Sequence, residues 1–188
     1  MKRFISVLVF AALAVAAFAQ EQTAKYEIKS GIVKTVTDMM GQKVEGTLYF
    51  DNYGAQEATV TKMATPAGEM EVSTIVKDGK TYMVNKTIKQ VQELPVPESI
   101  NYLDITDSAR EQYKIAEAGT EEILGKECTK YTEVVEQMGQ KLNATVWVWK
   151  GFPIKTEMEI QGMKITTEVV EFTENAIVLP YVFEVPTF

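Results

Sequence analysis

The sequence contains no histidine and only one cysteine. Without an imidazole, the chain cannot build a Ser-His-Asp or Cys-His nucleophile system, an H-E-x-x-H zinc site or a histidine proton shuttle. Cys128 has no second cysteine to form an intramolecular disulfide with. Its neighbours resemble the start of a strand, which favours a buried, inert thiol, and a reactive or intermolecular thiol is the alternative.

Motifs that bind phosphates or calcium are also missing from the sequence. It has no G-x-x-x-x-G-K-[ST] loop, no G-x-G-x-x-G fingerprint and no D-x-[DN]-x-[DN]-G loop. Paired carboxylates such as Glu157 and Glu159 would act as acid and base only if they faced each other across a cleft. Because Asp and Glu are spread over nearly every polar strand position, a solvated face explains them better. We therefore predict a protein that is not an enzyme and uses no cofactor or metal.

Positive charge is sparse in this acidic chain. The formal net charge is −7, and the lysines are scattered rather than clustered. Such a surface offers no footprint for a phosphate backbone, so we expect no nucleic-acid partner.

The first residues carry a targeting signal. Lys2 and Arg3 precede a short apolar run that ends in Ala17-Phe18-Ala19. A basic start, a short apolar region and an A-x-A site are typical of a cleaved signal peptide and too short for a transmembrane span. We therefore predict a signal peptide over 1–19 and a single domain over 20–188, with no transmembrane anchor and no lipid-anchor cysteine. The protein is expected to be periplasmic or secreted and soluble after cleavage.

The word Met-Gly-Gln-Lys occurs twice, at 40–43 and 138–141. Each copy joins two stretches of alternating hydrophobicity, as Gly162-Met163 does further on. We interpret Gly41-Gln42, Gly139-Gln140 and Gly162-Met163 as two-residue hairpin loops with glycine first, and Asp78-Gly79 as another hairpin signal. The repeated motif therefore predicts turns between strands and not a functional site.

These loops assign side chains to two faces of the sheet. In the first hairpin, Val33 shares one face with Val44 and Leu48. In the third hairpin, the drier face carries mostly aliphatic residues, and Glu157 falls opposite Glu168 on the wetter face. That like-charge pair would be unfavourable unless Lys155 or Lys164 offsets it or a bulge shifts the register.

The second hairpin places large apolar side chains on its wetter face. Trp147, Trp149 and Met138 lie there and need to be covered by a lid, a loop, a ligand or a partner. A helix packed over them would make them ordinary core, and the sequence does not decide between these alternatives.

One helix is available as a cover. The stretch 104–122 has Ser108 and Glu111 in the spacing of a capping box, with Gly119 near its end. Before it runs a loop with Pro95 and Pro97. Its apolar residues must be buried somewhere; among them are Ile100, Tyr102 and Leu103.

The rest of the chain predicts about ten strands. They span roughly 25–39, 43–51, 56–63, 69–77, 80–92, 126–137, 141–150, 153–160, 164–173 and 181–185. We therefore predict a mainly β protein, in which a curled antiparallel sheet forms an open, unclosed barrel capped by the short helix and the Pro-containing loop.

Several motifs resemble a known family. Leu124-Gly125 before Glu127-Cys128, the segment "WVWKGFPIK" and the closing "VFEVP" are similar to a family of unknown function in the periplasmic lipoprotein-carrier (LolA-like) superfamily. The resemblance implies an unclosed barrel whose concave face is capped by helix and loop, with a cavity for acyl chains. Two departures concern the lipoprotein shuttle itself: no residue matches the basic strand residue that controls the lid in true carriers, and the chain stops directly after the closing strand.

Two functions remain open. The first is a non-catalytic binding or carrier module for a lipid, an acyl chain or another apolar ligand, for which we expect these residues near the mouth: Ile100, Tyr102, Leu103, Met138, Trp147 and Trp149. The second is an envelope protein–protein interaction module, with a filled barrel and an exposed apolar patch that docks a partner chain.

Overall fold

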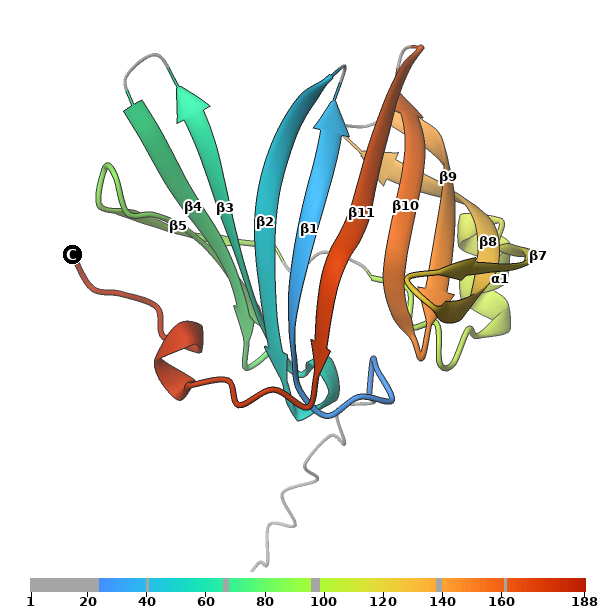
Figure 1. The fold of residues 1–188 in the computed structure, drawn as a ribbon, viewed down its shortest axis with the longest axis horizontal. Helices are drawn as coiled ribbons and strands as arrows, with labels where there is room; N and C mark the ends of the chain where they lie inside the picture. Colours follow the sequence, from blue (N-terminus) through green and yellow to red (C-terminus); the bar gives the residue numbers. More distant parts are fainter. Residues whose placement is uncertain (1–23, 40, 66–67, 96–98, 138–139, 161) are drawn as a thin grey trace, which may run out of the picture.

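The computed structural model describes residues 24–188 except 40, 66–67, 96–98, 138–139 and 161. Within these residues, eleven antiparallel strands form one sheet in the order β6-β5-β4-β3-β2-β1-β11-β10-β9-β8-β7 (Figure 1). The two edge strands, β6 and β7, do not pair with each other, so the sheet is not closed. The predicted fold class, an open antiparallel barrel, is confirmed.

The elements of the described chain are short and joined mostly by tight turns. The strands are β1 (Gly31–Met39), β2 (Gln42–Asp51), β3 (Gln56–Thr65), β4 (Gly68–Lys77), β5 (Lys80–Asn85), β6 (Gln90–Leu94), β7 (Ala116–Ile123), β8 (Lys126–Gln137), β9 (Gln140–Trp149), β10 (Phe152–Ile160) and β11 (Met163–Glu174). The helical elements are the α-helix α1 (Asp107–Tyr113) and the 3-10 turns η1 (Asn52–Gly54) and η2 (Pro180–Phe183).

Three predicted strands differ from the structure. The strand predicted over 25–39 begins only at Gly31. The stretch 80–92 is two strands, because the Asn85 side chain accepts hydrogen bonds from the backbone N–H groups of Thr87 and Ile88, at 3.1 and 3.2 Å, and turns the chain. The strand predicted at 181–185 is wrong. Pro180 begins the turn η2 there, since its fixed φ suits a helical first position and it has no N–H to donate to a sheet.

The predicted helix is too long and its cap is misplaced. Thr106 is the N-cap, accepting from the backbone N–H of Ala109 at 3.2 Å, while Ser108 lies inside α1. Lys114 adopts a left-handed conformation and ends the helix after Tyr113. The chain then forms β7, an edge strand that the sequence pattern did not indicate.

Three hairpins pair two residues away from the predicted register. Met39 lies opposite Gln42, Gln137 opposite Gln140, and Ile160 opposite Met163. Glycine is therefore the second loop residue, with φ of 84° at Gly41 and 80° at Gly162. The central residues of the second hairpin, 138–139, lie outside the described residues.

The fourth hairpin forms as predicted. Asp78 and Gly79 both have positive φ, 52° and 70°, as a type I′ turn requires, and Lys77 pairs with Lys80. In the other three hairpins the shift is an even number of residues, so every side chain stays on its predicted face.

The two-residue shift also removes the like-charge pair on the outside of the third hairpin. Lys155 lies opposite Glu168, and its Nζ is 3.1 Å from Glu168 Oε1 and 2.9 Å from Glu157 Oε1. Lys164 reaches Glu157 Oε2 at 2.9 Å. Burial alone would raise the pKa of Glu157. The hydrogen bonds from Lys164 and Lys155 nevertheless hold this pKa below its ordinary value.

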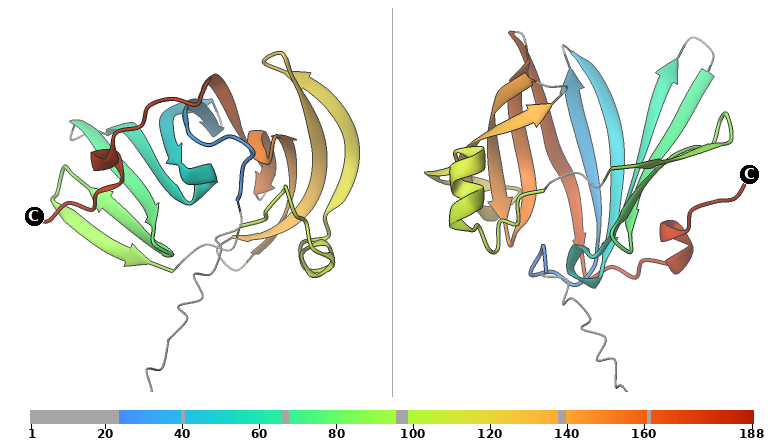
Figure 2. Two further views of the ribbon diagram at one scale, coloured as in Figure 1. Left: turned by 90° about the horizontal axis from the view of Figure 1, so that it is seen from below. Right: turned by 180° about the vertical axis from the view of Figure 1, so that it is seen from behind.

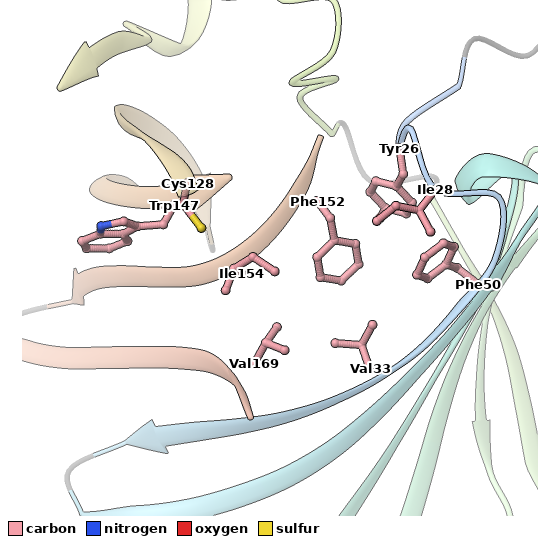
Figure 3. Close-up of a cluster of buried hydrophobic side chains, with 9 residues drawn as sticks. All are labelled: Tyr26, Ile28, Val33, Phe50, Cys128, Trp147, Phe152, Ile154 and Val169. Carbon is pink, nitrogen blue, oxygen red and sulfur yellow. The ribbon is translucent and has the colours of Figure 1, made fainter. Parts of the chain in front are cut away.

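The main core lies on the concave face of the sheet, which we call the inner face. Phe50 of β2 and Phe152 of β10 are separated by β1 and β11, yet their ring centroids are only 5.8 Å apart. The sheet must therefore curl with this face inside. Val33 of β1 and Val169 of β11 lie to one side of the rings, on the two intervening strands, and the segment before β1 adds Tyr26, as Figure 3 shows.

Two segments cover opposite faces of the sheet. The helix α1 and the residues before it lie on the inner side of β7–β9 (Figure 2), as predicted for the capping helix and loop. After β11, residues 176–188, which we call the C-terminal segment, cross the convex outer face toward β3–β5 (Figures 1 and 2). There Phe183 is buried against Ala58, Ile75 and Val84.

Candidate functional site

A cavity of about 970 Å³ separates the outer face of β1–β5 from the C-terminal segment. We call it the outer groove. Its floor comes from alternate residues of neighbouring strands, because residues that pair across antiparallel strands point to the same face. One row across the floor joins Thr47, Val60, Ser73 and Val84, and the next joins Tyr49, Ala58 and Ile75.

The row at the far end of the floor is charged. Glu45 of β2 pairs with Lys62 of β3, which pairs with Glu71 of β4. Lys86, just beyond β5, places its Nζ 2.9 Å from Glu71 Oε1. We call these four residues the charged row. Along the strands, the floor of the outer groove therefore changes from mostly apolar rows to one charged row, in which the sign alternates from strand to strand.

The C-terminal segment forms the roof of the outer groove. Its start is fixed by two hydrogen bonds: the Asn175 N–H donates to the Ser30 carbonyl at 2.7 Å, and the Ser30 hydroxyl donates to the Ala176 carbonyl at 2.8 Å. Phe183, only 2% exposed, anchors its middle. Beyond this anchor, Val185 and Pro186 also line the groove.

A smaller cavity of about 280 Å³ lies on the inner face, opposite the outer groove. Its walls combine aliphatic core residues with six threonines: Thr35, Thr37, Thr59, Thr61, Thr156 and Thr167. Thr37 and Thr167 share a hydrogen bond of 2.9 Å between their hydroxyls. Much of the concave face near this cavity is occupied by the core around Phe152 and Val33.

The capping loop is fixed to the inner face by a buried carboxyl group. The Tyr102 hydroxyl donates to Glu133 Oε2 at 2.8 Å, and its ring lies 5.5 Å from that of Tyr131. Burial raises the pKa of Tyr102, and the nearby Glu133 raises it further. Burial also raises the pKa of Glu133, although the hydrogen bond from Tyr102 opposes that rise.

Trp147 lies on the opposite face of β8–β9 from Tyr102. Its indole Nε1 donates to Glu121 Oε2 of the edge strand β7 at 2.7 Å. The ammonium groups of Lys130 and Lys155 each lie 4.9 Å from its ring centroid. The side chain is only 4% exposed and belongs to the same buried cluster as Cys128 and Ile154, so neighbours in its own sheet cover it.

Trp149 is covered in a related way, with Lys126 Nζ 3.6 Å from its ring centroid and Phe172 edge-on at 5.6 Å. Leu103 packs beside Gly151, where an added Cβ would lie 2.7 Å from Leu103 Cγ. Ile100 is half-buried. Met138 lies outside the described residues.

The structure does not bring the residues predicted near the mouth into one site. Tyr102 and Trp147 lie on opposite faces of the sheet, and neither the outer groove nor the inner cavity is lined by any of the five that the structure describes. Their role in ligand binding stays a prediction. The outer groove was missed although the alternation in β3 and β4 places Val60 and Ile75 on one face, because the C-terminal segment resembled a strand.

The remaining chemistry of the described residues is limited. Cys128 is fully buried, as predicted, and burial raises the pKa of its thiol. Its Sγ lies 3.4 Å from the Lys126 carbonyl oxygen. Among the described residues, no group of three or more Cys, Asp or Glu is arranged to hold a metal ion. None of the helices in this part of the chain is long and apolar enough to span a membrane.

The chain belongs to a protein family described as a domain of unknown function (DUF4412), whose model matches residues 30–150. No curated protein matches the sequence. The family match covers β1 to β9 and leaves out β10 and β11, which lie between β1 and β9 in the sheet. The description of the family names no activity.

Solved structures share the fold at low sequence identity. An uncharacterized conserved protein from Thermus thermophilus is 10% identical with a TM-score of 0.57, covering 85% of this chain and 87% of that one. MucB, in a structure of its complex with MucA(peri), is 12% identical with a TM-score of 0.52, covering 81% and 52%.

A third match is a LolA superfamily protein from Nitrosomonas europaea, 11% identical with a TM-score of 0.37, covering 86% of this chain and 92% of that one. The predicted resemblance to the lipoprotein-carrier superfamily is confirmed as a resemblance of fold. The likeness to these structures is one of fold.

Proposed function

We propose that the protein is a non-catalytic binding module for a lipid or similar amphipathic ligand in the cell envelope, and that the outer groove is its binding site. The observation that carries this proposal is the groove itself. Its volume of about 970 Å³ lies at the upper end of the range for small-molecule pockets, and apolar side chains line much of its roof and of its floor away from the charged row. The predicted signal peptide supports the location in the envelope.

The architecture suits binding better than catalysis. The outer groove is lined by aliphatic and aromatic residues, lysines and carboxylates. The carboxylates Glu45 and Glu71 face lysines across the strands instead of facing each other across a cleft. The opposed pair of carboxylates that acid–base chemistry would need is therefore not formed by these two residues.

The sheet offers a matched test, because β3 carries residues of both cavities side by side. Val60 lines the outer groove, and its neighbour Thr61 lines the inner cavity. We would express the full-length chain in a Gram-negative host so that the cell processes it. The variants Val60→Trp and Thr61→Trp would each fill one cavity.

Native mass spectrometry with organic extraction then measures whether each variant carries a bound lipid. We expect the unaltered chain and Thr61→Trp to carry an extractable lipid and Val60→Trp to have lost it. The reverse pattern would place the ligand in the inner cavity. A bare mass for the unaltered chain, even after incubation with excess phospholipid, would refute the proposal. Circular dichroism and thermal melting establish that each variant is folded.

A second candidate, docking of an envelope protein, is favoured by an exposed row of apolar residues. In the C-terminal segment, Ile177, Leu179 and Tyr181 are 89%, 50% and 66% exposed, while Val178 and Val182 pack against the sheet. MucB, which shares the fold, is described in complex with MucA(peri). A photo-crosslinking residue at position 177 would capture one discrete partner in the envelope if this candidate is right, and none if it is wrong.

A further inference from the structure

We infer that the outer groove selects an amphiphile with a zwitterionic head group of the phosphoethanolamine type, with its ammonium and phosphate on the charged row and its acyl chains along the apolar floor. This inference rests on the proposed function and adds the ligand class. Its geometric basis is the position of the charged row at one end of a floor whose other rows are mostly uncharged.

The charges of the row alternate in sign from strand to strand. Glu45, Lys62 and Glu71 lie directly opposite one another on β2, β3 and β4, and Lys86 continues the row. Neighbouring strands lie roughly 4.8 Å apart. Opposite charges therefore recur at an interval similar to the separation of phosphate and ammonium in an ethanolamine phosphate head group.

A head group of a single charge fits the row less well. An anionic head that approached Lys62 would also face Glu45 and Glu71 on both neighbouring strands. A cationic head beside Glu71 would meet Lys62 and Lys86 in the same way. Like charges brought together in a partly desolvated groove are repulsive, so only a ligand with both signs satisfies the row.

The contacts that such a ligand would replace are weak ones. Lys62 Nζ is 3.6 Å from Glu69 Oε1, and both side chains are more than half exposed. The Lys86 side chain is also more than half exposed, although its partner Glu71 is only 27% exposed. Exposed ion pairs contribute little to stability, so exchanging them for a phosphate and an ammonium costs the protein little.

The rows next to the charged row suit the remainder of the amphiphile. Thr47 and Ser73 offer hydroxyls one row along, where the ester groups of a lipid would lie, together with the aliphatic Val60 and Val84. The following row, with Tyr49, leads under Val182 of the C-terminal segment. Polarity thus falls along the groove in the order in which it falls along a phospholipid.

The test compares three probes with the same acyl chain: lysophosphatidylethanolamine, lysophosphatidylglycerol and monoacylglycerol. Their head groups are zwitterionic, anionic and uncharged. Affinities for the delipidated full-length chain would be measured below the micelle concentration by native mass spectrometry. We expect the zwitterionic probe to bind about tenfold more tightly than either of the others.

Three variants connect this preference to the charged row. Glu71→Gln should shift the preference toward the anionic probe. The double variant Lys62→Gln/Glu71→Gln should bind all three probes alike. Lys164→Gln, a lysine on β11 that does not line the outer groove, is the matched control and should retain the tenfold preference.

The outcomes separate the two claims. Equal affinity of the unaltered chain for all three probes, or a preference for the anionic one, would overturn the inference and leave the proposed function standing. Failure of all three probes to bind would overturn both. Binding of an apolar peptide in the groove with no binding of any probe would also overturn both and favour the docking of a protein. Because the substituted side chains are at the surface or groove rim, thermal melting should show that the variants remain folded.

Discussion

The phenol of Tyr102, in the loop that caps the inner face, donates a hydrogen bond of 2.8 Å to Glu133 of β8, which is only 6% exposed. This contact joins two segments 31 residues apart in the sequence. It gives a buried carboxyl group a partner from the loop, and it therefore links the position of the loop to the ionisation of a single residue.

Replacing Tyr102 by Phe tests the strength of this link. The substitution keeps the ring against Tyr131 but leaves the Glu133 carboxyl without the phenol that donates to it. We expect a loss of about 1–3 kcal/mol in the free energy of unfolding at neutral pH, the usual cost of an unpaired buried polar group. Urea denaturation measures it. An unchanged midpoint and slope would show that water replaces the phenol at no cost.

Replacing Glu133 by Gln tests the pH dependence of stability. Burial raises the pKa of Glu133 in the folded protein above its ordinary value of about 4.3. The folded state therefore holds the proton more tightly than the unfolded state, so this group lowers the stability as the pH rises from its ordinary pKa through its folded pKa. Glu133→Gln retains an oxygen that accepts from Tyr102 and should remove that decline.

The measurement for Glu133 is the free energy of unfolding between pH 4 and pH 7. The difference between Glu133→Gln and the unaltered protein should become more favourable to the variant as the pH rises. Glu27→Gln, which removes an exposed carboxyl group, is the control. A difference that is constant over this range for Glu133→Gln would contradict the assignment of a raised pKa.

Hydrophobic alternation and turn residues predicted most of the sheet. The strands around Val33, Ile154 and Val169 fell on the correct faces, because alternation reports burial on one side of a sheet directly. The registers were wrong by two residues, since a two-residue loop can hold glycine first or second. Only pairing across the whole hairpin, which sets Lys155 against Glu168, distinguishes the two.

The candidate site was harder to predict because it depends on contacts distant in sequence. Trp147 resembled a ligand-binding residue, and its cover is a carboxylate of the edge strand β7, whose residues had been assigned to a helix. The outer groove forms only where the C-terminal segment crosses β3 and β4, and local patterns carry no information on where a non-strand segment lies. Alternation could identify the apolar floor but not its roof.

Replacing Phe183 by Ala should release the C-terminal segment while the sheet stays folded. Phe183 fills a pocket formed by Ala58, Ile75 and Val84, and removing a buried phenyl ring costs about 3 kcal/mol. Residues 176–188 should then become susceptible to chymotrypsin, which cleaves beside the exposed Tyr181. Mass spectrometry of the digest gives the cleavage site. Phe188→Ala, at a position 56% exposed, should leave the segment protected.

Replacing Gly46 by Ala should disturb the inner cavity through one identifiable contact. A Cβ at this position would lie 2.8 Å from Thr35 Oγ1 on the neighbouring strand, closer than such atoms approach without displacement. We expect a loss of about 1–3 kcal/mol in the free energy of unfolding, typical of overpacking. Thr35→Ala removes the obstructing hydroxyl. In the Thr35→Ala background, Gly46→Ala should therefore cost much less stability than it costs in the unaltered chain, so the double variant should be nearly as stable as Thr35→Ala alone. Additive losses in this double-mutant cycle would show that the cost arises in the β2 backbone and not in the contact with Thr35.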